Sequence, residues 1–317
     1  MVRRNGSAEL LNVGSILFAV VCWGLAPVAT RYLLQVFTPL QLVVVRYILS
    51  LLFFVPTLFT LRKGRWNRRA MLRALLCGLA NILGYNLCVA YGIQHIPAST
   101  ASFILATESI WIALFSLLIF HERAHWIVFL GFAVSTVGIG VLIGWQSFGL
   151  TASTSISTYI GAGLTLLAAM MWGIYTLAVR PLSQKYGSLA STSITTIYGT
   201  IPLFAGYHSA VIMHLQSLGV ARWGALLFLV LCSTILAFIL WNYAVARLPG
   251  TQVSLFLYLV PCVGAAGGFL LLHETLTAGT LFGGLLIIAG VVFAQLPQLR
   301  VWRNAATAMP KAGASEH

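Results

Sequence analysis

The chain has 317 residues, of which 60% are hydrophobic and only 7% are charged. A soluble domain carries about 25% charged residues, so this chain lacks the polar surface of a water-facing globule. Its charge is also one-sided, because 18 Lys and Arg residues accompany five glutamates and no aspartate. These proportions exclude a soluble enzyme, a disordered chain and a disulfide scaffold. They favour a helical protein that crosses a membrane several times.

Ten apolar runs follow one another, and each approaches the roughly 20 residues that a spanning helix needs. They lie at 13–34, 40–61, 72–93, 98–120, 126–146, 158–179, 188–213, 223–245, 251–272 and 278–296. The ten-residue alternating segments of a β-barrel do not occur. The sequence therefore predicts an all-α integral membrane protein with ten transmembrane helices.

The formal net charge of +13 has two readings, a nucleic-acid surface or a topology signal. We favour topology, because the chain has no polar face to carry a nucleic-acid site. With the N-terminus inside, 15 basic residues lie on the cytoplasmic side, Arg31 and Arg222 lie outside, and Arg46 lies within a span. We expect a multi-pass protein of the cell (plasma or inner) membrane with both termini in the cytoplasm.

Several motifs occur twice in the same order. Trp23-Gly24 recurs as Trp172-Gly173 at an offset of 149 residues. Four further features recur at an offset of 152: Pro97 as Pro249, His121-Glu122 as His273-Glu274, Gly131 as Gly283 and Gly138 as Gly290. Each half holds five spans, an odd number, so the second half must be inserted upside down. Inverted repeats around a midplane site are the architecture of secondary transporters.

The repeat divides the chain into five parts. We expect a cytoplasmic tail at 1–11, a first five-helix repeat at 12–146, a linker at 147–157, a second repeat at 158–296 and a cytoplasmic tail at 297–317.

These paired motifs resemble the drug/metabolite transporter (DMT) superfamily, and specifically its ten-span EamA-type exporters. The resemblance covers about 12–296. It implies a plasma-membrane carrier of small metabolites, often amino acids, with a cavity lined by the first four helices of each half and the fifth helices outside. The family pattern has a proline midway along each fourth helix. The second half has Pro261, but the first half has Ser109, which leaves a helix break there in doubt.

Glu108 lies about ten residues, or ~15 Å, into the fourth span. A charged side chain at mid-bilayer costs at least ~2.5–3.5 kcal/mol, so a carboxyl group there is expected to face a cavity. We predict a proton-coupling or cation-binding role for Glu108. The alternative is a protonated side chain hydrogen-bonded to a neighbouring helix.

Arg46 lies about six residues, or ~9 Å, inside the outer end of the second span. It could bind a substrate carboxylate through two parallel hydrogen bonds. It could instead pair with Glu108, or extend its guanidinium towards the interface.

Other polar and aromatic side chains recur at helical spacing or at matched depth in the two halves. As substrate-binding residues, besides Glu108 and Arg46, we predict Trp23, Asn81, Tyr85, Trp111, Trp172, Tyr175 and Tyr258. Aromatic side chains around a cavity suit an aromatic or apolar substrate, although ordinary interhelical packing explains each of them about as well.

Glu122 and Glu274 open the fifth span of each half, where a carboxylate can cap a helix N-terminus. We predict no metal site and no cofactor, because no His, Cys or Glu set has ligand spacing. Phosphate loops and nucleotide-binding fingerprints are also missing, so we expect neither an enzyme nor an ATP-driven pump.

The sequence thus predicts a secondary active transporter of small metabolites. The favoured version exports amino acids or related compounds by alternating access, coupled to protons. The alternatives are a multidrug or organic-cation exporter, a passive channel and a non-transporting membrane scaffold. Its expected partners are a small-molecule substrate, the lipid bilayer and protons, without nucleic acid, and we expect a monomer.

Overall fold

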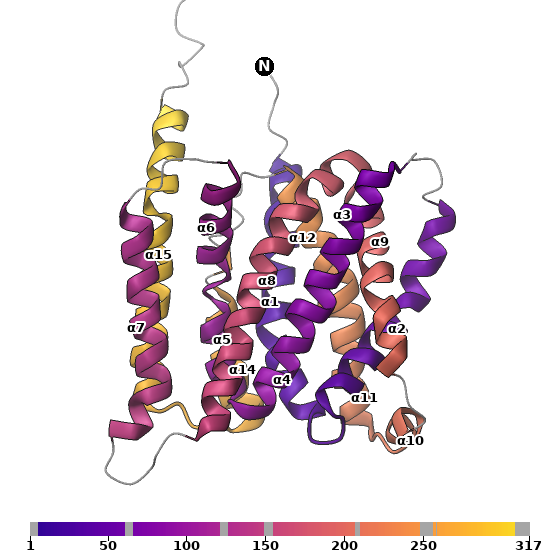
Figure 1. The fold of residues 1–317 in the computed structure, drawn as a ribbon, viewed down its shortest axis with the longest axis horizontal. Coiled ribbons are helices and arrows are strands. Elements are labelled where there is room, and N and C mark those ends of the chain that lie inside the picture. The colour runs from indigo at the N-terminus through magenta and orange to yellow at the C-terminus, as the bar shows by residue number, and fades with distance from the viewer. Residues whose placement is uncertain are drawn as a thin grey trace, which may run out of the picture.

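The computed structural model describes residues 6–60, 66–120, 126–148, 155–206, 210–247, 256–257 and 259–307. Across these ranges the secondary structure is helical, and the long helices run between the two ends of the molecule (Figure 1). The predicted all-α fold of two inverted five-helix halves is confirmed. In Figure 1 the N-terminus is marked at the top, and α15, the last pass, also ends there.

Each half contributes five passes. The first half contains α1 (Gly6–Leu33), α2 (Pro39–Thr60), a third pass of α3 (Arg68–Leu79), η1 (Ala80–Leu87) and α4 (Cys88–His95), a fourth of α5 (Ala98–Leu105) and α6 (Glu108–Phe120), and α7 (Trp126–Phe148). The second half contains α8 (Ile156–Tyr186), α9 (Ser188–Thr200) with η2 (Ile201–Gly206), the short α10 (Ala210–Gln216), an eighth pass of α11 (Val220–Leu227), η3 (Phe228–Leu236) and α12 (Ala237–Arg247), then α14 (Leu259–Leu272) and α15 (Ala278–Thr307).

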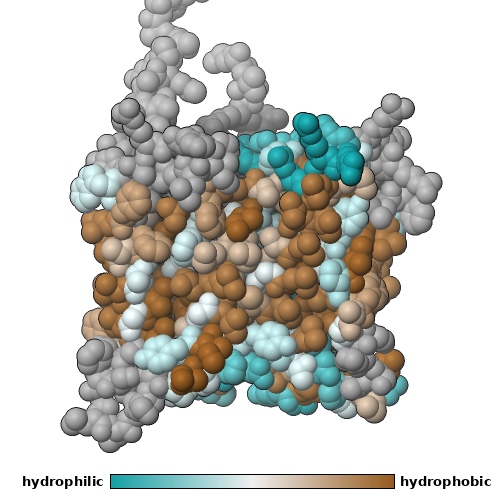
Figure 2. Space-filling model, viewed as in Figure 1, coloured by the Kyte–Doolittle hydropathy of each residue, from teal (hydrophilic) through white to brown (hydrophobic). Residues whose placement is uncertain are grey.

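Many large apolar side chains are exposed, and they form a hydrophobic belt on the face that Figure 2 shows. In Figure 2 a hydrophobic band covers the middle of the visible face, and hydrophilic side chains gather at its upper and lower edges. By length and composition, six described helices could each cross a membrane: Val13–Leu33, Pro39–Thr57, Arg68–His95, Ala98–Ser116, Ile156–Tyr186 and Val220–Ala244. Three shorter apolar helices, Phe129–Ile143, Leu259–Leu272 and Ala278–Ala294, belong to the same belt.

The third pass of each half contains a π-helical segment, in which backbone hydrogen bonds join residues five apart. These segments are η1 in the first half and η3 in the second. Their first residues, Ala80 and Phe228, are 148 positions apart, close to the 149 that relates Trp23 to Trp172. Long π-helical segments are rare and often mark functional sites. The repeat has therefore placed the same irregularity in both halves.

The fourth pass of the first half is broken despite its missing proline. A turn at Ala106–Thr107 separates α5 from α6. The Thr107 hydroxyl donates to Ile104 O at 2.7 Å, which supplies a local alternative to the helical hydrogen bonds. The break makes Glu108 the first residue of α6, close to mid-membrane.

The seventh pass differs from the predicted run at 188–213. Its α-helix ends at Thr200, continues as the 3₁₀ turns of η2, and is followed by the separate helix α10. Pro202 lies at this change of helix type. Proline has no amide hydrogen and clashes with the carbonyl four residues earlier, so it ends regular α-helix there.

The two fifth helices, α7 and α15, pair with each other at one side of the bundle (Figure 1). Gly131 of α7 packs on Gly290 of α15, and Gly138 packs on Gly283. Gly131 therefore faces the repeat counterpart of Gly138, and Gly138 faces the repeat counterpart of Gly131. The close approach also lets Ser135 donate to Ile287 O at 3.1 Å. Small residues are what such helix crossings in membranes require.

Glu274 caps a helix, but the helix belongs to the other half. Its carboxylate accepts hydrogen bonds from Ala98 N at 2.8 Å and Ser99 N at 3.0 Å, at the start of α5. The start of α15, which follows Glu274, is capped instead by Thr277, whose hydroxyl accepts from Thr280 N. Glu274 therefore joins the halves. Its counterpart Glu122 lies outside the described residues.

Candidate functional site

Arg46 is buried inside the bundle, with 8% of its surface exposed. Its Nε donates to Thr234 Oγ1 at 2.6 Å, its Nη1 to Asn86 Oδ1 at 3.1 Å and its Nη2 to Ser233 Oγ at 3.2 Å. Asn86 belongs to η1, whereas Ser233 and Thr234 belong to η3. The guanidinium therefore points inward and binds the π-helical segments of both halves at once.

The two π-helical segments present equivalent side chains to Arg46. Asn86 Nδ2 donates to Asn81 O at 3.0 Å, and Thr234 Oγ1 donates to Leu229 O at 2.8 Å. Each contact joins residues five positions apart. The two donors, Asn86 and Thr234, are 148 positions apart in the chain, and so are the two acceptors, Asn81 and Leu229. The π geometry thus orients one oxygen from each half towards the same guanidinium.

A small cavity of about 30 Å³ lies beside Arg46. Its lining comes from both halves and comprises Trp23, Ala26, Pro27, Thr30, Arg46, Tyr85, Asn86, Val89, Leu105, Trp172, Ser233 and Phe238. This volume has room for about one water molecule. The helices around it must therefore move apart before a metabolite can enter, and the described conformation is closed around the site.

Glu108 belongs to the same cluster through Tyr85. The side chain of Tyr85 is hydrogen-bonded to the Glu108 carboxyl group and also lies near Arg46. Glu108 is 8% exposed and stands at the N-terminus of α6, where the amide groups of the first turn favour negative charge. Tyr85 thus connects the carboxyl group of Glu108, the buried one among the described residues, with the guanidinium beside the cavity.

Aromatic rings close one side of this cluster. The Trp23 and Trp172 ring centroids are 5.0 Å apart, and those of Trp23 and Trp241 are 5.1 Å apart. Trp23 Nε1 also donates to Ser233 O at 3.1 Å, which ties α1 to η3. Phe238 packs on Trp23 with a centroid distance of 5.4 Å. The repeated tryptophans thus meet at the boundary between the halves.

Tyr175 lies deeper in the aromatic cluster and is fully buried. Its hydroxyl accepts a hydrogen bond of 3.3 Å from Asn242 Nδ2, which also donates to Thr192 Oγ1 at 2.8 Å. Tyr175 contacts Trp172 with a centroid distance of 5.3 Å but is not among the residues that line the cavity. It supports the cavity wall from behind.

The remaining predicted residues lie in different places. Asn81 contacts the cluster through Asn86. Trp111 packs on Phe115 and Phe132, with centroid distances of 5.8 and 5.5 Å, between α6 and α7 and away from the residues that line the cavity. Tyr258 lies outside the described residues. Among the described residues, no group of three or more His, Cys or Glu residues could hold a metal ion.

Sequence reasoning missed the residues that hold Arg46. Ser233 and Thr234 lie in an apolar run and are common packing residues, so their type alone gave no signal. The repeat relates Thr234 to Asn86 only at an offset of 148 residues, one fewer than the offset of the Trp-Gly motifs, so the sequence motifs alone did not align the two.

Inverted halves, two irregular third passes and a buried polar cluster at their boundary match the architecture of membrane transporters built from inverted repeats. The model of the EamA-like transporter family matches residues 11–144 and again 159–295. The chain belongs to this family, and both halves carry the family's repeat. Like its relatives, it is a multi-pass membrane protein.

Several curated relatives carry transport names. The "Probable terminal-alkyne amino-acid exporter" of Streptantibioticus cattleyicolor is 30% identical over 232 residues, covering 73% of this chain and 75% of that protein. The "Probable amino-acid metabolite efflux pump" of Salmonella typhimurium is 27% identical and covers 92% and 94%. A solved crystal structure superposes with a TM-score of 0.60 at 17% identity, covering 93% of this chain and 99% of that one, which supports the fold.

Proposed function

We propose that this protein exports amino acids or related small metabolites as a proton-coupled secondary transporter that works by alternating access. The observation that carries the proposal is the position of Arg46, which holds the π-helical segments of both halves beside the cavity. A guanidinium has five N–H groups. The three described hydrogen bonds use one on each nitrogen, which leaves one N–H on Nη1 and one on Nη2 for a carboxylate.

A bound amino acid would meet groups of both signs. Its carboxylate would accept two parallel hydrogen bonds from Arg46, a strong and orienting arrangement. Its ammonium group would be placed towards Tyr85 and Glu108. Exchange of a proton at Glu108 would then change the charge next to the substrate, and so link substrate release to proton uptake.

Alternating access would follow from the same contacts. Arg46 belongs to the first half, and Ser233 and Thr234 belong to the second. Movement of the halves past each other must break these bonds, and a carboxylate bound at the two remaining N–H groups would keep the Arg46 guanidinium paired while they break. Binding energy at Arg46 would thereby favour the conformational change.

The proposed orientation has both termini in the cytoplasm. The end of the bundle where α1 begins and α15 ends carries eight basic residues of the described helices, and the opposite end carries two. The eight are Arg68, Arg69, Arg73, Arg180, Lys185, Arg247, Arg300 and Arg303, and the two are Arg31 and Arg222. This imbalance supports that orientation by the positive-inside rule. We further propose that the protein works as a monomer in the cell membrane.

Counterflow in proteoliposomes tests the function. Vesicles loaded with one amino acid should take up the labelled form, and other amino acids should compete. The matching amines and carboxylic acids, each lacking one of the two charged groups, should compete at least tenfold more weakly. Equal competition by hydrophobic organic cations would instead indicate a multidrug exporter. Flux without counterflow would indicate a channel, and either result would overturn the proposal.

A further inference from the structure

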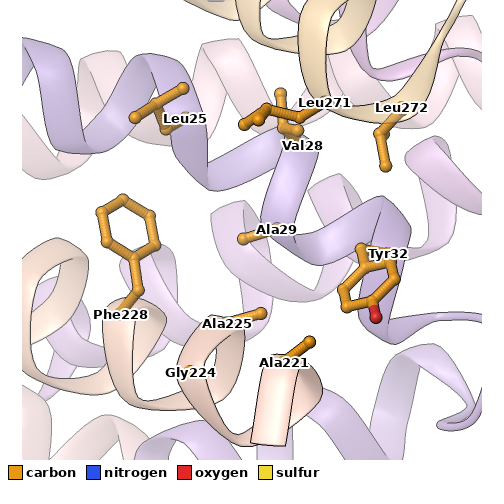
Figure 3. Close-up of a pocket in the computed structure, with 10 residues that line it drawn as sticks. All are labelled: Leu25, Val28, Ala29, Tyr32, Ala221, Gly224, Ala225, Phe228, Leu271 and Leu272. Atoms are coloured by element: carbon orange, nitrogen blue, oxygen red, sulfur yellow. The ribbon is translucent and has the colours of Figure 1, made fainter.

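A second and larger hollow lies between α1, α11 and α14, away from Arg46. Its volume is about 540 Å³. Four elements line it, α1, α11, the start of η3 and α14, with Leu25, Val28, Ala29, Tyr32, Ala221, Gly224, Ala225, Phe228, Leu271 and Leu272 (Figure 3). The hydroxyl of Tyr32 is the polar side-chain group of this lining. We call this hollow the α1–α11 groove.

The groove is open because its walls carry small residues. A Cβ atom added at Gly224 would meet nothing within 4 Å, and Ala221 and Ala225 flank this position. Leu271 at its edge is 64% exposed, so the groove meets the outer surface of the belt. Between Leu25 and Tyr32 the groove follows α1 for seven residues, or ~10 Å. This is about two-thirds of the ~15 Å hydrocarbon depth of one leaflet.

One end of the groove is positively charged. Tyr32 and Ala221 face each other at this end, opposite Leu25 and Phe228 (Figure 3). The guanidinium of Arg222 lies 5.9 Å from the Tyr32 ring centroid. Arg222 Nε is buried and has no hydrogen-bond partner among the described residues. The first turn of α11 adds free amide groups, because no side chain caps it at Gly219.

The other described arginine at this end of the bundle is already used. Arg31 donates to the carbonyl oxygens of Ile93 and Gln94, at the end of α4. Of the two described arginines at this end, Arg222 is therefore the one that lies beside the apolar groove and has a nitrogen without a hydrogen-bond partner. An acyl chain matches the groove, and a phosphodiester matches the positive charge of the Arg222 guanidinium beside Tyr32 and the start of α11.

We infer that the α1–α11 groove binds one anionic phospholipid from the leaflet on the side opposite the termini, with an acyl chain along α1 and the headgroup phosphate at Arg222. The site joins α1 of the first half to α11 and α14 of the second. A lipid bound there contacts both halves at once, and its occupancy influences how readily they separate.

The test measures which lipids stay bound to the purified full-length protein. The protein is equilibrated with equal amounts of phosphatidylglycerol and phosphatidylcholine of identical chains, and retained lipids are counted by native mass spectrometry. We expect one retained phosphatidylglycerol. Gly224→Leu fills the groove and should retain neither lipid. Arg222→Gln should keep a lipid but lose about fivefold of the preference for the anionic headgroup.

Arg247→Gln is the matched control, because it removes the same charge at the opposite end of the bundle. It should behave like the wild type. Equal retention of both lipids by the wild type, or an unchanged headgroup preference in Arg222→Gln, would overturn the inference. Retention of detergent or an apolar solute in place of phospholipid would overturn it as well. The Arg222→Gln comparison decides the matter even if Gly224→Leu does not fold.

Discussion

Arg46 Nε donates to Thr234 Oγ1 at 2.6 Å, and this bond joins residues 188 positions apart in opposite halves of the protein. Thr234 can hold this position because its own hydroxyl hydrogen donates to Leu229 O, five residues back in a π-helical segment. Asn86 does the same in the other half, through Asn81 O. The position of the Arg46 guanidinium therefore depends on the two π-helical segments, η1 and η3, which lie at matching places in the two halves.

Replacing Thr234 should weaken this junction. Thr234→Val keeps the shape but removes the acceptor, which leaves Arg46 Nε buried without a partner. We expect a loss of ~1–3 kcal/mol in the free energy of unfolding. Thermal unfolding in detergent measures it.

Thr200→Val is the control for that change, because the Thr200 hydroxyl donates only to Thr196 O within its own helix. It should cost clearly less. Equal losses in the two variants would mean that the bond to Arg46 adds nothing to stability.

Neutralising Glu108 should separate substrate binding from proton coupling. Glu108→Gln keeps the size and the hydrogen-bonding capacity towards Tyr85 but cannot exchange a proton. We expect amino-acid counterflow to persist while accumulation driven by a pH gradient is lost. Uptake into proteoliposomes at set inner and outer pH measures both. Unchanged gradient-driven accumulation in Glu108→Gln would rule out the coupling role.

Glu274→Gln should destabilise another of the contacts that join the two halves. The two carboxylate oxygens of Glu274 accept from Ala98 N and Ser99 N. The side-chain amide of glutamine has only one oxygen in place of these two. We expect ~0.5–2 kcal/mol lower stability by thermal unfolding. Thr277→Ala removes the local cap of α15 and provides a comparison within the same loop. The cross-half cap is refuted if Glu274→Gln unfolds at the wild-type temperature.

The glycines of α7 offer a matched pair. A Cβ added at Gly138 would lie 2.8 Å from Gly283 O, whereas one at Gly140 would meet nothing within 4 Å. Gly138→Ala should therefore cost ~1–3 kcal/mol through overpacking. Gly140→Ala should be neutral or stabilise by up to ~1 kcal/mol, because alanine favours helix. Thermal unfolding of the two variants should differ in sign, and identical shifts would contradict the described helix pair.

Much of the fold could be predicted because membrane insertion imposes long apolar runs. The ten spans and the inverted repeat follow from hydropathy and from motifs such as Trp23-Gly24 and Trp172-Gly173. The break before Glu108 could not be predicted from Ser109, because a turn here needs no proline when a hydroxyl such as that of Thr107 binds the backbone. The end of α9 near Pro202 was missed because the apolar run continues past it.

Four of the residues predicted to bind substrate, Trp23, Arg46, Tyr85 and Trp172, line one cavity. Their role in substrate binding stays a prediction. Trp111 lies elsewhere. It follows Glu108 by about one helical turn, and this spacing fixes its distance along the helix but not which neighbouring helix its side chain contacts. The partners of Arg46 depend on contacts between distant passes and on π-helical geometry, which local sequence patterns do not encode.

The role of Arg46 in recognising a carboxylate can be measured directly by comparing amino-acid and amine transport in Arg46→Lys. Lysine keeps the charge but lacks the planar fork. Arg31→Lys serves as the control for an Arg-to-Lys change at a site that binds only backbone carbonyls. We predict that Arg46→Lys lowers amino-acid counterflow by roughly tenfold or more while the matching amine is transported as before. Wild-type amino-acid counterflow in Arg46→Lys, with Arg31→Lys also unchanged, would contradict carboxylate recognition by Arg46.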